Sequence, residues 1–173
     1  RYFDRITRPE QIIQSLPNAI NTMLDQADCG PATISISQDV QGESFDYPEI
    51  FFQEKIHEIR RISPDAVQIK KAVDLIKNSK QPIIISGGGV LYSEAEKELS
   101  NFASKHNIPV VQTVMGFGSM SKDDPYNIGP VGGLGGRAAN TIAKKTDLAI
   151  AIGTKLADFT TGSWANFENP NFK

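Results

Sequence analysis

The chain has 173 residues, of which 39% are hydrophobic, enough for one domain or for one domain with part of another. Its 18 basic and 20 acidic residues nearly cancel, so it has neither a basic surface for nucleic acid nor a polybasic patch for a membrane. No apolar run approaches the roughly 18 residues that cross a bilayer. The single Cys29 cannot form an internal disulfide, and no Cys/His cluster indicates zinc, so we expect a reducing, cytoplasmic setting.

The first 40 residues predict a helix followed by a strand. Apolar side chains recur at helical spacing over residues 8–27, with Thr7 as the expected N-cap and Pro17 as the expected site of a kink or break. Residues 32–37 alternate in the manner of a strand, for which no partner strand is expected in this chain. Because the chain opens on Arg1 without a methionine, we expect both ends to be cut from a longer polypeptide.

Residues 41–62 show no regular period and carry several aromatic side chains. This composition favours a linker whose aromatic rings pack on a neighbouring domain.

From Ser63 onward, helices alternate with short apolar strands. The expected helices are 63–80, 93–106 and 136–146, and the expected strands are 82–86, 108–113 and 147–153. Strands that are apolar throughout and alternate with helices predict a parallel sheet covered on both faces, which is a doubly wound α/β fold. Three strands are few for such a sheet, so we expect more strands beyond Lys173.

Two of these helices have further sequence signals. Ser93 and Glu96 have the spacing of a capping box, and the second helix has a buried stripe expected at Ala95, Leu99, Phe102 and Ala103. The first helix has an apolar face formed by Ile69, Ala72, Val73 and Ile76.

Three consecutive glycines, Gly87, Gly88 and Gly89, join the first strand to the next helix. A dinucleotide fingerprint requires a third glycine where this chain has Tyr92, and it requires an acidic residue at the end of the next strand, where none is found. NAD binding is therefore disfavoured, and a P-loop is excluded because no Gly-Lys-Ser/Thr occurs. Two alternatives remain: binding of another nucleotide such as a flavin, or a sharp turn that lets the backbone approach its neighbours closely.

Residues 113–120 and 129–140 follow a strand or open a helix, and residues 153–164 follow a strand, so these segments belong at the carboxyl edge of the sheet, where ligands bind in this architecture. In residues 129–140, Gly135 and Gly136 lead into a helix whose free N–H groups could hold an anion, with Arg137 in its first turn. An ordinary glycine-rich loop is the alternative. In residues 153–164, a polar loop is the favoured interpretation over a ligand crevice lined by Lys155, Asp158, Thr160 and Thr161. The spacing of His57 and His106 indicates no acid–base pair.

The stretches "QPIIISGGGV", "IPVVQTVMGFGSM" and "LGGRAANTIAKKTDLAIAIGTKL" together resemble the central domain of thiamine-diphosphate-dependent enzymes of the acetolactate synthase type. "GPATISISQDV" resembles the end of their pyrimidine-binding domain, with Ser37 in place of the usual proline. The resemblance implies three parts: the end of a pyrimidine-binding domain (1–40), an interdomain linker (41–62) and a Rossmann-like central domain truncated at its C-terminus (63–173).

Within that superfamily, acetolactate synthases tend to have Arg-Phe-Asp-Asp-Arg after the third strand, whereas this chain has "TKLADFTTGSWANFENPN". With "QDVQGESFDYPEIFF", this segment is more similar to the hydrolases of myo-inositol catabolism. The resemblance implies cleavage of a C–C bond in a cyclic trihydroxy-1,2-dione to give 5-deoxyglucuronic acid. It also implies a homodimer or homotetramer that acts on this cyclic polyol-dione without nucleic acid or membrane. The alternative is a fragment of an acetolactate synthase-like carboligase with an FAD-binding central domain.

The family's cofactors, thiamine diphosphate and Mg²⁺, are implied for the longer protein. The family's activating glutamate and its Gly-Asp-Gly motif with a following Asn are not in this chain, so we expect the fragment to be structural, with no catalytic or metal-binding residue. In flavin-containing relatives the matching positions lie along FAD, and here we expect a vestigial crevice without FAD at Gly87, Gly88, Gly89, Thr113, Met115, Gly116, Gly118, Gly135, Gly136 and Arg137.

Overall fold

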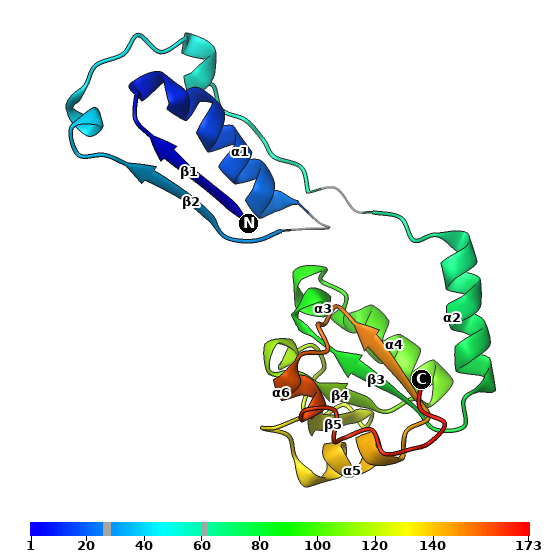
Figure 1. Cartoon of the computed structure of the whole chain (residues 1–173). Helices are drawn as coiled ribbons and strands as arrows, with labels where there is room; N and C mark the ends of the chain where they lie inside the picture. The colour runs from blue at the N-terminus through cyan, green and yellow to red at the C-terminus, as the bar shows by residue number, and fades with distance from the viewer. Residues whose placement is uncertain (26–28, 60–61) are drawn as a thin grey trace. The chain divides into compact units, whose positions relative to one another are not determined.

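The computed structural model describes residues 1–25, 29–59 and 62–173, which form two compact units, Arg1–Pro64 (unit 1) and Asp65–Lys173 (unit 2). Figure 1 shows the elements of each unit. Within the described ranges, no helix is both long enough and apolar enough to cross a membrane.

Unit 1 begins with a strand–helix–strand arrangement. Strand β1 (Tyr2–Ile6) and strand β2 (Ala32–Ile36) pair in parallel, with Tyr2 opposite Ala32 and Ile6 opposite Ile36. The expectation that the strand after the first helix has no partner is therefore wrong. β1 escapes a search for apolar runs because two adjacent charged residues, Asp4 and Arg5, interrupt it. Only Ile6 is fully buried.

Helix α1 (Ile12–Leu24) follows a short 3₁₀ turn, η1 (Pro9–Gln11). The expected N-cap at Thr7 is wrong, because the Gln11 side chain caps this end: its Oε1 accepts from the N–H of Thr7 at 2.7 Å and of Arg8 at 3.0 Å. The expected break at Pro17 is also wrong, since the helix is continuous through it. Buried Ser15 lies before the proline and donates from Oγ to the Asp4 carboxylate of β1, which ties the helix to the sheet.

The aromatic residues of segment 41–62 pack on one another within unit 1. The rings of Tyr47 and Phe51 stack with centroids 5.6 Å apart, and the Tyr47 hydroxyl donates to the Pro9 carbonyl at 3.2 Å. Two short 3₁₀ turns, η2 (Val40–Gly42) and η3 (Glu49–Phe52), shape the segment. Phe52 stays 70% exposed. The interpretation of 41–62 as an interdomain linker remains a prediction.

Unit 2 contains a four-stranded parallel sheet in the order β5-β4-β3-β6. Its strands are β3 (Pro82–Ser86), β4 (Val110–Gln112), β5 (Asn127–Pro130) and β6 (Leu148–Ile152). Three of them confirm the strands expected from the sequence. β5 lies in the glycine-rich stretch and was not expected, because Gly129 and Pro130 interrupt its pattern and its pairing with β4 shifts register.

Helices cover both faces of this sheet, which confirms the doubly wound α/β fold (Figure 1). On one face, Ile84 and Val110 pack with Leu99 and Ala103 of α4. On the other, Ile83 and Val111 share a core with α5. The helical elements of unit 2 are α2 (Ala66–Asn78), α3 (Gly88–Tyr92), α4 (Glu96–His106), η4 (Val114–Gly116), α5 (Arg137–Lys145) and α6 (Asp158–Thr161).

The two helix signals have different outcomes. Ser93 ends the short helix α3, and α4 has Ala95 at its N-cap position without a side-chain cap, so the capping box is wrong. α2 begins at Ala66, where Asp65 accepts from the N–H of Gln68. Its apolar face is largely uncovered within the described residues: Ile69 is 49% exposed, whereas Ile76 packs against the core.

Candidate functional site

The carboxyl edge of the unit 2 sheet brings together three connections that are far apart in the sequence. The turn after β3 makes a hydrogen bond on each side: the Ser86 carbonyl accepts from the Thr113 N–H at 2.9 Å, and the Gly87 N–H donates to the Ile152 carbonyl at 2.9 Å. A third bond joins the Gly89 N–H to the Gly153 carbonyl at 2.8 Å. The turns after β3, β4 and β6 therefore form one continuous structure.

The glycines at this edge permit a very close approach of backbones. A Cβ on Gly89 would lie 2.6 Å from the Gly153 Cα, and a Cβ on Gly116 would lie 2.8 Å from the Gly87 Cα. Real Cβ atoms essentially never lie this close to another heavy atom. The triple glycine had two interpretations, a nucleotide-binding turn or a sharp turn with close backbone approach. These distances are direct evidence of close backbone approach. Gly153 (φ +58°) is a member of this group that the sequence analysis did not identify.

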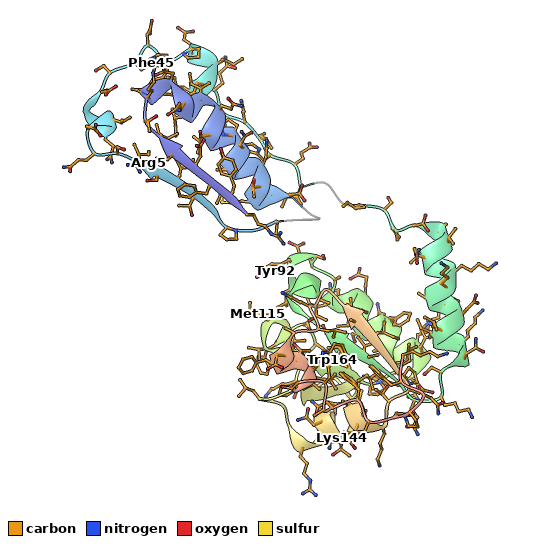
Figure 2. The ribbon with its side chains drawn as sticks, viewed as in Figure 1. Arg5, Phe45, Tyr92, Met115, Lys144 and Trp164 are labelled. Carbon is orange, nitrogen blue, oxygen red and sulfur yellow. The ribbon has the colours of Figure 1, made fainter. Side chains whose placement is uncertain are left out.

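The candidates after β4 divide into buried and exposed residues. Thr113 is 4% exposed, and its Oγ1 accepts from the Gly116 N–H at 3.1 Å, which caps the turn η4. Gly116 is also buried. In contrast, Met115 is 69% exposed (Figure 2), and Gly118 (φ +94°) has open space beside it. The predicted residues after β4 therefore do not line one surface together.

A cluster of buried polar side chains stabilises the connection after β4. The hydroxyls of Ser86 and Ser119 lie 2.6 Å apart, and Gln112 Nε2 donates to the Met120 carbonyl at 3.2 Å. All three side chains are at most 2% exposed. The sequence analysis missed this cluster, since isolated serines in apolar surroundings give no pattern that identifies them.

The turn after β5 holds Gly135, Gly136 and Arg137 at the start of α5. Gly136 N–H donates to the Pro130 carbonyl at 2.8 Å. Asn140, which was not singled out, bridges this turn: its Oδ1 accepts from the Gly132 N–H at 2.9 Å and its Nδ2 donates to the Gly132 carbonyl at 3.0 Å. Arg137 is exposed. The turn is therefore stabilised by its own helix.

The segment after β6 crosses to the turn after β5, where Gly133 N–H donates to the Phe159 carbonyl at 2.8 Å. Two of the four polar side chains proposed to line a crevice here, Asp158 and Thr161, are engaged within the segment itself. Asp158 Oδ1 accepts from the Ser163 hydroxyl at 2.8 Å, and Thr161 Oγ1 accepts from the Trp164 N–H at 3.2 Å. Thr160 is buried and Lys155 is exposed. The polar-loop interpretation fits this arrangement better than a ligand crevice.

The segment also contains an unusual backbone turn. Gly162, Ser163 and Trp164 follow one another with φ values of +57°, +55° and +64°. Residues other than glycine rarely adopt the left-handed region, and the bonds from the Ser163 hydroxyl and the Trp164 N–H support it here. The turn leaves Trp164 55% exposed (Figure 2).

No metal site accompanies these loops. Among the residues that the structure describes, no group of three or more His, Cys, Asp or Glu side chains is placed to hold a metal ion. His57 and His106 are both exposed, and the His106 ring lies beside Phe102 with centroids 4.6 Å apart.

A hollow of about 970 Å³ lies elsewhere, toward the opposite edge of the sheet, between α2 and residues 170–173. Its lining includes Asp147, whose carboxylate accepts from the Ser79 hydroxyl and from the N–H groups of Lys80 at 2.8 Å and Gln81 at 3.0 Å. The hydrogen bond from Ser79 is the main reason that the pKa of Asp147 lies below its ordinary value. This carboxylate stabilises the connection into β3, so the hollow does not add to the predicted site.

The comparisons with known proteins agree with this fold. The family described as "Thiamine pyrophosphate enzyme, central domain" matches residues 69–173. A protein from Clostridium botulinum (strain Alaska E43 / Type E3) named 3D-(3,5/4)-trihydroxycyclohexane-1,2-dione hydrolase is 47% identical over 99% of this chain and 27% of its own length. Proteins with the same name from Clostridium perfringens (strain 13 / Type A) and Bacillus thuringiensis (strain Al Hakam) are 48% and 46% identical, each over 98% of the chain.

The chain spans about a quarter of the length of these relatives, 27% in the two clostridial proteins and 26% in the Bacillus protein. The family match covers more than half of the chain, from α2 through the sheet of unit 2. The chain belongs to the thiamine pyrophosphate enzyme family, and residues 69–173 correspond to the central domain of that family.

Proposed function

We propose that this chain is one section of a thiamine-diphosphate-dependent hydrolase that cleaves a C–C bond of a cyclic trihydroxy-1,2-dione to 5-deoxyglucuronic acid in myo-inositol catabolism. The carrying observation is the 46–48% identity, over nearly the whole chain, to proteins named as hydrolases of that dione. An identity confined to the central domain would support only the broader enzyme family.

The section itself has a structural role in this proposal. The polar groups best placed for chemistry at the carboxyl edge are already engaged: Thr113 caps η4, and Asp158 and Thr161 stabilise their own turn. The bonds across the edge connect the turns after β3, β4 and β6 into one unit. We therefore assign to unit 2 the task of bracing the catalytic parts of the longer protein and its subunit interface.

Thiamine diphosphate and Mg²⁺ do not fit the residues that the structure describes. A diphosphate–Mg²⁺ site requires clustered oxygen ligands, and the described residues contain no cluster of acidic side chains suited to a metal ion. When bound, the cofactor supplies the electron sink for breaking the C–C bond. In the proposal, the residues that bind it lie in parts of the longer protein outside this chain.

The proposal also includes no FAD at the carboxyl edge. Gly87, Gly88 and Gly116 are buried under atoms of the protein itself, and the N–H groups of Gly87 and Gly89 donate to backbone carbonyls of the β6 connection. These groups are thereby occupied without a ligand. The ten predicted residues remain a vestigial crevice in this proposal, and the FAD-binding carboligase remains the alternative to exclude.

The remaining parts of the proposal are a cytoplasmic location, a homodimer or homotetramer, and the boundaries 1–40, 41–62 and 63–173. They rest on the sequence, on its single cysteine and on the family resemblance.

The decisive experiment is an assay of the full-length protein that contains this chain, supplied with the cyclic dione and, separately, with pyruvate. We expect consumption of the dione with release of one acid, abolished by removal of thiamine diphosphate and Mg²⁺ and restored by their return. Residues 1–173 alone, as the matched control, should consume no dione and give no saturable heat with thiamine diphosphate. Condensation of pyruvate by a yellow, flavin-containing preparation that leaves the dione intact would establish the carboligase instead.

A further inference from the structure

We draw no further inference here: the strongest candidate, the exposed apolar side chains on the carboxyl-edge connections of unit 2 (Tyr92, Met115, Phe117, Phe159 and Trp164), carries nothing because nothing in the structure shows what covers them.

Discussion

Gly89 and Gly153 lie in direct backbone contact although 64 positions separate them in the chain: the N–H of Gly89 donates to the carbonyl of Gly153 at 2.8 Å. A methyl group on Gly89 would lie 2.6 Å from the Gly153 Cα, so the two backbones would have to shift apart, which strains this bond. We therefore expect Gly89→Ala to lower the free energy of unfolding by about 1–3 kcal/mol, the usual range for forced overpacking. Urea denaturation followed by circular dichroism measures this difference.

Gly133→Ala is the matched control, because the nearest heavy atom to its added Cβ is a Phe159 ring carbon at 3.7 Å, an ordinary contact distance. It should leave stability within about 0.5 kcal/mol of the wild type. Equal losses in the two variants would contradict the close packing of Gly89 against Gly153.

The buried hydroxyls of Ser86 and Ser119 supply a second prediction. Removing one hydroxyl leaves the other buried without its hydrogen-bond partner. Ser119→Ala should therefore lower the free energy of unfolding by about 1–3 kcal/mol. The double variant Ser86→Ala/Ser119→Ala should cost less than the sum of the single variants, because it removes both members of the pair. Ser104→Ala, at an exposed position, is the control and should have little effect. Strict additivity in this double-mutant cycle would refute the interaction.

Asp147 provides a prediction that depends on pH. Its folded-state pKa is lowered, first by the Ser79 hydroxyl and then by backbone N–H groups, so the ionised form stabilises the fold. That contribution is complete above the unfolded-state pKa of about 3.9 and is lost as pH falls through the lower folded-state value. Asp147→Asn should therefore lower stability by about 1 kcal/mol at pH 7, and the difference should shrink below pH of about 4.

Thermal unfolding of both proteins at neutral and acidic pH tests this sign. Asp74→Asn, another acidic residue beside the same hollow, should differ little from the wild type at either pH. A difference for Asp147→Asn that grows on acidification would contradict the assignment.

Replacement of isoleucine by alanine should change the free energy of unfolding by very different amounts in the sheet and on α2. Ile84 is fully buried at the centre of the sheet, so Ile84→Ala should cost about 2–5 kcal/mol. Ile69 is 49% exposed on α2, and Ile69→Ala should change stability by less than about 0.5 kcal/mol. Denaturant titration of the chain of residues 1–173 measures both, and a large loss for Ile69→Ala would show that the apolar face of α2 is covered in solution.

The sequence predicted the elements whose pattern is locally complete. The uninterrupted "PIIIS" gave β3 with both ends correct, and the spacing of Leu99 and Ala103 gave the buried stripe of α4. β1 and β5 were missed because neither has an uninterrupted run of apolar residues. Charged residues interrupt β1, and Gly129 with Pro130 interrupts β5. The apolar face of α2 was identified correctly, but periodicity does not say what covers a face.

The position of the candidate site was predictable from topology, whereas its internal bonding was not. Parallel strands place their following turns at one edge, which is why the turns after β3, β4 and β6 do meet. The roles of Gly153 and Asn140 depend on contacts with Gly89 and Gly132, and no local motif encodes such pairs. The part that these loops play in a cofactor site remains a prediction.

The strand order β5-β4-β3-β6 has a consequence for synthesis on the ribosome. β3 and β4 pair early, but the other side of β3 is closed only by β6, which begins at Leu148. Until β6 has left the exit tunnel, β3 is an outer strand, and the backbone N–H and C=O groups that later pair with β6 are unpaired. A nascent chain stalled before Leu148 therefore carries an unpaired strand edge, a feature that can pair with another chain and seed aggregation.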